Sequence, residues 1–260
     1  MLIQPCVAGK FYSEDPNILR RDVLAMLADA ADKAKITPPK AIIAPHAGYI
    51  YSGPIAASAY ACLTQVKDKI KRVVLFAPSH HHPINGIATT TADYYLTPLG
   101  KIAIDQKTIT QADFSDLNIA DEAFNAEHSL EVQLPFLQLT LGKFSLIPLL
   151  VGFTTPKQVE KLLETFWDGP ETLVVISSDL SHYNAYKVAQ NMDSKTARAI
   201  TSLNPDGFTA DDACGAVAIK GLLTIAARKK MKGSQVDLRN SGDTEGPKDA
   251  VVGYGAFHFK

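Results

Sequence analysis

Four short runs of consecutive apolar residues recur along the chain and are typical of buried strands. A run that is apolar at every position belongs to a strand covered on both faces, whereas a half-exposed strand alternates. A further strand is predicted near the C-terminus, and one stretch after the second run favours another strand or a hairpin. These segments are residues 41–44, 73–76, 144–151 and 173–176, then 251–259 and 89–97.

Helical periodicity fills the segments between these runs. Asp15 and Pro16 suit the N-cap and the first turn of a helix, and apolar residues follow at helical spacing from Leu19 to Ala30. Similar patterns predict helices at residues 55–63, 131–141 with a kink at Pro135, 156–167, 187–203 and 216–230.

The alternation of buried strands and helices predicts an α/β fold. We expect a single three-layer domain over residues 1–260, with a central, mostly buried sheet flanked by helices on both faces. No internal repeat and no linker-like segment divides the chain, which favours one domain over two.

Composition narrows the class of protein. Lys and Arg number 26 and Asp and Glu 27, so the net charge of −1 gives no reason to expect nucleic acid or anionic membranes as partners. The first residues lack a secretory pattern, and no apolar window approaches the roughly 20 residues of a membrane span. Three widely spaced cysteines favour a reducing compartment, and we expect the cytoplasm.

Histidines gather where the predicted strands end. The chain has seven histidines, and five of them directly follow one of the apolar runs. Ligands of open α/β sheets bind beyond the carboxyl ends of the strands. If the strands are parallel, His46, His80, Asp179 and His182 converge at one edge. A lone histidine after a strand is more often structural, and His81 and His82 cannot both point inward beside His80.

Two predicted helix starts supply further candidates. Glu127 and His128 precede the apolar helix that includes Leu134, and Cys214 precedes the helix that begins near residue 216. The positive end of a helix dipole lowers the pKa of a thiol and favours the thiolate, which is also the metal-binding form. The structural alternatives are a small buried cysteine and a carboxylate that merely stabilises a helix N-terminus.

With these residues assembled, the chain resembles the Memo family, known in prokaryotes as AmmeMemoRadiSam system protein B. The segments that carry the resemblance occur in order over nearly the whole chain. They read AGKFY at 8–12, PHAGY at 45–49 with YSG at 51–53, PSHH at 78–81, EHSLE at 127–131 with QLP at 133–135, SSDLSH at 177–182, and Cys214-Gly215.

The resemblance implies a fold similar to class III extradiol dioxygenases, with a metal pocket beyond one sheet edge. It implies His46, His80 and Cys214 as metal ligands, with copper or iron as the metal and zinc as a further option. By the same resemblance Glu127, His128, Asp179 and His182 border the pocket as candidate catalytic residues. No other cofactor is implied, and partner proteins of the AmmeMemoRadiSam system are expected.

Three functions compete on this basis. In a metal-dependent oxidoreductase, His128 or His182 would move protons and Asp179 would orient His182 or a water. In a zinc hydrolase, the metal would lower the pKa of a bound water. A binding module would hold a small molecule or peptide, of unknown identity, against Tyr49, Tyr51 and Tyr183. A Cys214 nucleophile paired with His182 is a fourth hypothesis.

Overall fold

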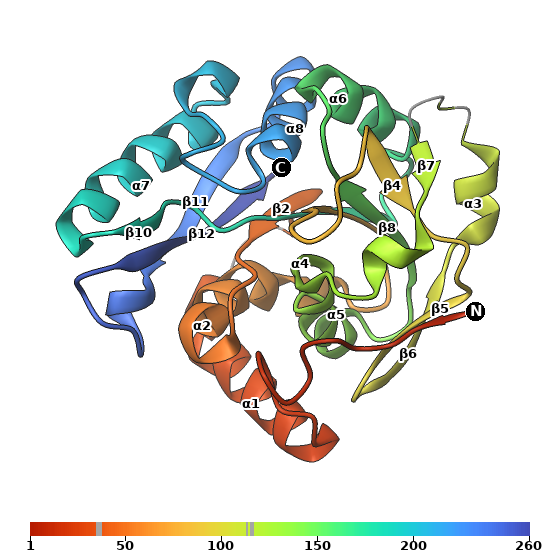
Figure 1. Ribbon diagram of the computed structural model, residues 1–260, viewed down its shortest axis with the longest axis horizontal. Coiled ribbons are helices and arrows are strands. Elements are labelled where there is room, and N and C mark those ends of the chain that lie inside the picture. The colour runs from red at the N-terminus through yellow and green to blue at the C-terminus, as the bar shows by residue number, and fades with distance from the viewer. Residues whose placement is uncertain (35–37, 113, 115–116) are drawn as a thin grey trace.

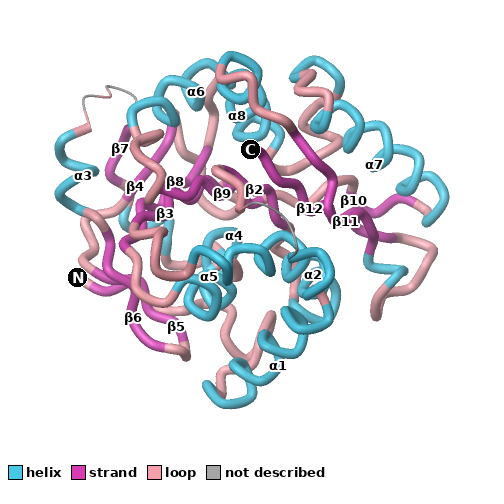
Figure 2. Tube along the Cα trace, turned by 180° about the vertical axis from the view of Figure 1, so that it is seen from behind, coloured by secondary structure: helices cyan, strands magenta, loops and turns pink. Residues whose placement is uncertain are grey.

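The computed structural model describes residues 1–34, 38–112, 114 and 117–260. Its centre is a mixed sheet with helices on both faces, which confirms the predicted α/β class (Figure 1). The helices α6 (Pro156–Thr165), α7 (Tyr186–Thr201) and α8 (Ala216–Arg228) lie on one side. Figure 2 shows, from behind, α1 (Pro16–Asp29), α2 (Tyr49–Tyr60), α4 (His128–Glu131) and α5 (Leu134–Leu141) on the other side.

All four apolar runs form parallel strands at the middle of this sheet. They are β2 (Ala41–Ala44), β3 (Arg72–Pro78), β8 (Ser145–Val151) and β9 (Thr172–Ser177), in the spatial order β8-β3-β9-β2. The register places Val74 beside both Ile147 and Val174. Because the strands are parallel, their carboxyl ends share one edge of the sheet. This is the condition under which the residues that follow the strands were predicted to converge.

Antiparallel and short strands extend the sheet at both sides. The predicted C-terminal strand is β12 (Val251–Phe259), which lies antiparallel between β2 and β11 (Gly233–Asn240) and also pairs with β10 (His182–Asn184). On the far side the remaining elements are β1 (Leu2–Ile3), β4 (Ile87–Thr89), β5 (Tyr94–Thr97), β6 (Gly100–Ile104), β7 (Leu117–Ile119) and the short helix α3 (Gln106–Gln111).

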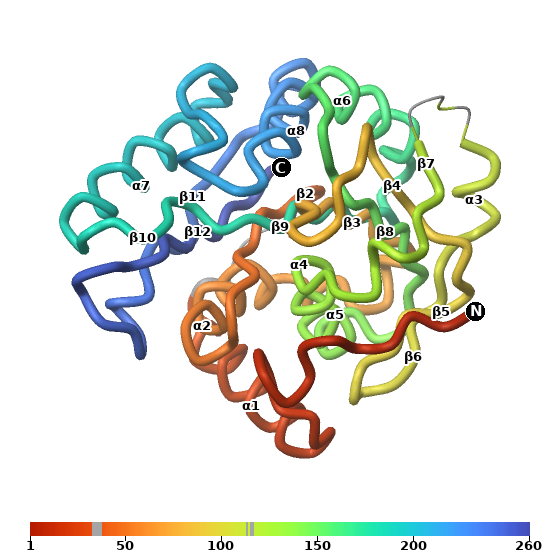
Figure 3. The backbone as a smooth tube through the Cα atoms, viewed as in Figure 1, coloured from red at the N-terminus to blue at the C-terminus, as the bar shows by residue number. Residues whose placement is uncertain are grey.

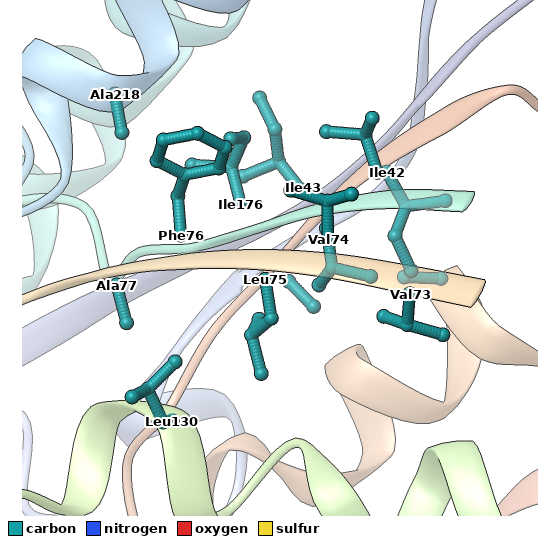
Figure 4. Close-up of a cluster of buried hydrophobic side chains, with 14 of the residues drawn as sticks. Ile42, Ile43, Val73, Val74, Leu75, Phe76, Ala77, Leu130, Ile176 and Ala218 are labelled. Atoms are coloured by element: carbon teal, nitrogen blue, oxygen red, sulfur yellow. The ribbon is translucent and has the colours of Figure 1, made fainter. Parts of the chain in front are cut away.

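Side chains of the central strands fill the core on both faces. In Figure 4, Phe76 and Ile176 point to the side of Ala218 on α8, whereas Leu75 and Ala77 point to the side of Leu130 on α4. All of these strand side chains are fully buried. Burying a large apolar side chain stabilises a fold by about 1.5–3 kcal/mol, so this two-sided packing fixes where the strands end.

Two predicted helices differ in their bounds. The helix expected from residue 55 begins at Tyr49 instead, because the Gly53-Pro54 pair interrupts the helical pattern without interrupting the helix. Pro54 cannot donate to the carbonyl of Ile50, and Ile50 is 62% exposed, so water can take that bond. The predicted kink at Pro135 is a break: α4 ends at Glu131, and α5 begins with Pro135 in its first turn.

The N-terminal segment is tied to the helical layer of α4. In Figure 3 it is the red segment that runs from β1 towards α1, past α4 and α5. The buried carboxylate of Glu131 accepts hydrogen bonds from the backbone nitrogens of Cys6 (2.7 Å) and Val7 (3.1 Å) and from the Tyr12 hydroxyl (2.5 Å). These bonds place Lys10 and Phe11 at the pocket described below.

No helix in the described part of the chain is both long and apolar enough to span a membrane.

Candidate metal centre

Three imidazoles meet beyond the carboxyl ends of β2 and β3. His46 follows β2, His80 follows β3, and His128 is the first residue of α4. Among the described residues, these three form a group whose candidate ligand atoms all lie within 4.8 Å of one another. The rings of His80 and His128 stack at 4.9 Å, and His46 meets both at steep angles. Such a group can hold a metal ion.

One buried carboxylate positions two of the three rings. Glu127 caps the N-terminus of α4 by accepting the Ser129 backbone N–H. Its Oε2 accepts the His80 backbone N–H at 2.5 Å, and its Oε1 lies 3.0 Å from His80 Nδ1 and 3.4 Å from His128 Nδ1. With Nδ1 directed to the carboxylate, Nε2 is the nitrogen left for a ligand in each ring.

The charges of this group suit metal binding. Burial opposes ionisation of Glu127, but hydrogen bonds from the His80 side chain and backbone outweigh it and hold the pKa at about 2. Burial lowers the pKa of His128 to about 4, against the attraction of Glu127. Burial, with the neighbouring His80 and His128, lowers the pKa of His46 well below its ordinary value. At neutral pH His46 and His128 are therefore uncharged, the form that ligates metals.

His46 is held by a different set of partners. Its backbone nitrogen donates to Asp179 Oδ1 at 2.7 Å, and its Nδ1 lies 2.8 Å from the hydroxyl of Ser177, the last residue of β9. The side chain is only 2% exposed. That Asp179 orients His182 or a bound water stays a prediction; in the structure its carboxylate holds the loop that carries His46. Burial raises the pKa of Asp179 to about 7, despite the N–H groups that it accepts.

Cys214 lies beside His46 but is not part of the group of three imidazoles. Its sulfur is 3.3 Å from His46 Nε2 and accepts the Asp179 backbone N–H at 3.2 Å. The prediction that the helix start favours a thiolate is wrong, because burial raises the pKa of Cys214 to about 12, with Asp179 adding to the effect. Whether the thiol ligates the metal stays a prediction. The structure pairs it with His46, and not with His182 as the nucleophile hypothesis supposed.

The imidazoles line a pocket of about 560 Å³. Its walls include Phe11, Tyr51 and Tyr254, and Asp179 also lines it. His182 lies on this wall with part of its ring exposed, and the partial removal of the ring from water lowers its pKa. The backbone of Tyr183, next to it, has a φ of 57°, which is rare for an aromatic residue. Of the predicted catalytic residues, His128 belongs to the group of three imidazoles, and Glu127 contacts two of those imidazoles. Asp179 and His182 line the pocket.

Sequence interpretation missed two supporting residues. Ser177 and Gln133 are fully buried, and each hydrogen-bonds the other's side chain behind His46. Both lie inside the segments SSDLSH and QLP that carried the family resemblance. Both are polar residues within or next to apolar stretches, which indicates buried side chains. A buried polar side chain needs hydrogen-bond partners, so this position could have marked them as supporting residues.

The fold and the site together define an α/β protein with three histidines at one edge of its sheet that could hold a metal ion. The chain matches the model of the Memo-like protein family over residues 4–258, and it belongs to that family. It is similar to a MEMO1 family protein of Aquifex aeolicus, with 36% identity over 96% of both chains. It is also similar to MEMO1 family proteins of Methanopyrus kandleri (33%) and Saccharolobus solfataricus (30%), each over 98% of both chains.

Proposed function

We propose that this protein is a metal-dependent oxidoreductase that uses copper or iron and acts on a small organic molecule bound in the pocket. The observation that carries the proposal is the convergence of His46, His80 and His128 at a pocket of about 560 Å³. Each ring has its Nδ1 directed to a protein group, so the ligand nitrogens are oriented before a metal arrives.

The donor chemistry fits these metals. Imidazole suits copper, iron and zinc, and a thiolate favours copper and zinc further. Nitrogen and sulfur ligands that share one tetrahedral metal, at about 2.1 and 2.3 Å from it, stand about 3.6 Å apart. The 3.3 Å separation of His46 Nε2 and Cys214 Sγ is close to that value for this one pair, but Cys214 lies outside the group whose ligand atoms are all within 4.8 Å of one another, so the proposal rests on the three imidazoles. When bound, copper or iron would supply one-electron and O₂ chemistry.

The remaining pocket residues have roles that their surroundings suggest. Asp179 has a pKa of about 7, so its carboxyl group can take up or release a proton near neutral pH. Phe11, Tyr51 and Tyr254 give the pocket an apolar, aromatic wall that suits an organic ligand and excludes water. His182, on the same wall and with a lowered pKa, is placed to hydrogen-bond a ligand as a neutral imidazole.

A zinc hydrolase is the second candidate, and one observation favours it. Three neutral imidazoles with an open fourth position are a known ligand set of catalytic zinc, where the metal lowers the pKa of a bound water to about 7. The uncharged state of His46 and His128 fits that set equally well. The two functions differ in their dependence on O₂ and on a redox-active metal.

Anaerobic loading of the purified, tag-free protein with Cu⁺, Fe²⁺ or Zn²⁺ tests the proposal. We expect one metal ion per chain, loss of binding in His46→Ala and His128→Ala, and retention in His82→Ala. His82 is a suitable control because it belongs to the same loop as His80 but lies outside the group of three. Redox cycling of the copper or iron form, with consumption of O₂ in the presence of ascorbate, would support an oxidoreductase.

Two results would contradict this function. Failure of every ion to bind at one per chain would remove the metal centre itself. Turnover of model esters by the zinc form, unaffected by O₂, together with copper and iron forms that do not cycle, would replace the oxidoreductase by the hydrolase.

A further inference from the structure

A chain of hydrogen bonds between buried side chains runs from the core to the back of His46. The Tyr60 hydroxyl donates to Gln133 Oε1 at 2.8 Å, Gln133 Nε2 contacts Ser177 Oγ at 2.8 Å, and Ser177 Oγ contacts His46 Nδ1 at 2.8 Å. The first three side chains are fully buried and His46 is 2% exposed, so water does not compete for these bonds. Each hydrogen in the chain can therefore be assigned by counting donors and acceptors.

Two backbone carbonyls fix the orientation of the Gln133 amide. Its Nε2 lies 2.9 Å from the Pro45 oxygen and 3.4 Å from the Ala44 oxygen, and carbonyl oxygens only accept. The nitrogen must be on that side, which leaves Oε1 to accept from Tyr60. An amide nitrogen has two hydrogens, so one serves the carbonyls and the other is donated to Ser177 Oγ.

The hydroxyl of Ser177 then has one arrangement that satisfies every partner. It has a single proton, and the Ser129 carbonyl oxygen, 2.7 Å away, can only accept that proton. One acceptor position of Oγ is taken by Gln133. The remaining position faces His46 Nδ1, which must therefore be the nitrogen that carries hydrogen.

We propose that Ser177 and Gln133 are positioning residues that hold His46 as the Nδ1–H tautomer, so that Nε2 presents its lone pair. This inference rests on the proposed function only for the use of that lone pair, which is metal ligation. The Cys214 sulfur lies 3.3 Å from Nε2 and receives the Asp179 N–H, so its S–H can donate either to this lone pair or to the Asp179 carbonyl oxygen at 3.7 Å.

The arrangement separates the three imidazoles into two kinds. His80 and His128 direct Nδ1 to the anionic Glu127, which strengthens an imidazole as a ligand. His46 donates to a neutral hydroxyl whose other two hydrogen bonds are made with Gln133 and the Ser129 carbonyl. The tautomer of His46 thus follows from the number of donors and acceptors around Ser177 Oγ.

Nitrogen-15 NMR of the wild-type protein, histidine-labelled and free of metal, tests the tautomer directly. Signals are assigned by their loss in His46→Gln. We expect His46 to show a protonated Nδ1 and an unprotonated Nε2 near neutral pH. An Nε2–H tautomer, or an equal mixture of both tautomers, would overturn the proposal, and this measurement needs no variant of the supporting residues to fold.

Ser177→Ala then tests the assigned role of the hydroxyl. We expect the Nε2–H tautomer to appear at His46 and the Zn²⁺ affinity to fall by about 10–100-fold, the usual effect of losing an outer partner of a ligand. Ser177→Thr, which keeps the hydroxyl, should restore the Nδ1–H signal. Ser52→Ala is the matched control, because Ser52 is also buried and donates to the nearby Ala47 carbonyl.

The outcomes separate this inference from the proposed function. If wild type binds no Zn²⁺, Cu⁺ or Fe²⁺ but shows Nδ1–H, the metal function fails and the tautomer assignment stands. If Ser177→Ala folds, as judged by its circular dichroism and cooperative unfolding, and keeps Nδ1–H unchanged, then Ser177 does not fix the tautomer and the proposal fails.

Discussion

Glu127 binds His80 through both of its carboxylate oxygens. Oε2 accepts the backbone N–H at 2.5 Å, while Oε1 lies 3.0 Å from Nδ1 of the ring. The loop after β3 and the start of α4 are thereby joined at one buried, ionised side chain, which also faces His128. This carboxylate positions two of the candidate ligands, although it is not itself a member of the group of three imidazoles.

We therefore predict that Glu127→Gln weakens Zn²⁺ or Cu⁺ binding by about 10–100-fold, because a neutral amide supports two imidazoles less well than a carboxylate does. Competition with a chromogenic chelator measures the affinity. Glu122→Gln is the control, since Glu122 is an exposed carboxylate 3.7 Å from His82. Equal affinities in the two variants would show that Glu127 only caps α4.

The three thiols should be slow to react in the native protein. Burial raises the pKa of Cys6, Cys62 and Cys214 to about 12 in each case, so little thiolate is present at pH 8. We predict labelling by iodoacetamide at least about tenfold slower than that of free cysteine, and three rapidly labelled thiols in urea. Mass spectrometry identifies the sites. A rapidly labelled thiol that disappears in Cys214→Ala would show that the helix start dominates after all.

Asp193 should make the folded state less stable as pH rises from about 4 to 6. Burial, reinforced by Asp212, raises its pKa to about 6 although it accepts the Ser181 N–H. Because this folded-state pKa lies above the unfolded value, the protonated acid favours folding. That contribution, on the order of 3 kcal/mol, is complete below pH 4 and is lost as pH rises through 6.

Urea unfolding across pH 4–8 checks this expectation. Asp193→Asn should be more stable than wild type at pH 7 and should show a smaller decline over that window, because the amide has no proton to lose while Asp179, with a pKa raised to about 7, still titrates. Asp206→Asn removes an exposed carboxylate and should keep the wild-type profile. A parallel decline in Asp193→Asn and wild type would mean that other groups cause it.

Tyr12→Phe should loosen the N-terminal segment. The lost hydroxyl removes one of the donors to buried Glu131 and leaves it with Cys6 and Val7, at a cost of about 1–3 kcal/mol in the free energy of unfolding. Limited proteolysis should cleave near Lys10 sooner than in wild type. Tyr186→Phe removes a similar bond to Asp243 at the surface and should have a smaller effect on both measurements. Unchanged cleavage would argue against the anchoring role.

The strands that are buried on both faces could be predicted from sequence, and so could the half-exposed β5 within residues 89–97, whereas β11 could not. The run at residues 41–44 has no polar residue, and it forms β2. The strand β11, with the sequence GSQVDLRN, was missed because it pairs with β12 alone and its side chains are mostly half-buried. Its pattern therefore resembles a polar loop.

The location of the candidate site could be predicted from the sequence, but the hydrogen-bond partners of its residues could not. Strand ends indicated His46 and His80, and the predicted helix start indicated His128. The hydrogen-bond partner of each imidazole depends on the conformations of the loops, which cannot be predicted from the spacing of apolar residues. Thus the Asp179 carboxylate accepts the backbone N–H of His46, and burial of Cys214 overrides the dipole of a helix that begins two residues later.

The three imidazoles belong to loops that are 34 and 48 residues apart along the chain, at positions 46, 80 and 128. An ion bound by all three imidazoles would link these distant segments of the chain, and it would have to dissociate when the protein unfolds. Occupancy should then be visible as a rise in melting temperature that grows with the logarithm of the ion concentration, so a simple thermal scan can rank metals without knowledge of the substrate.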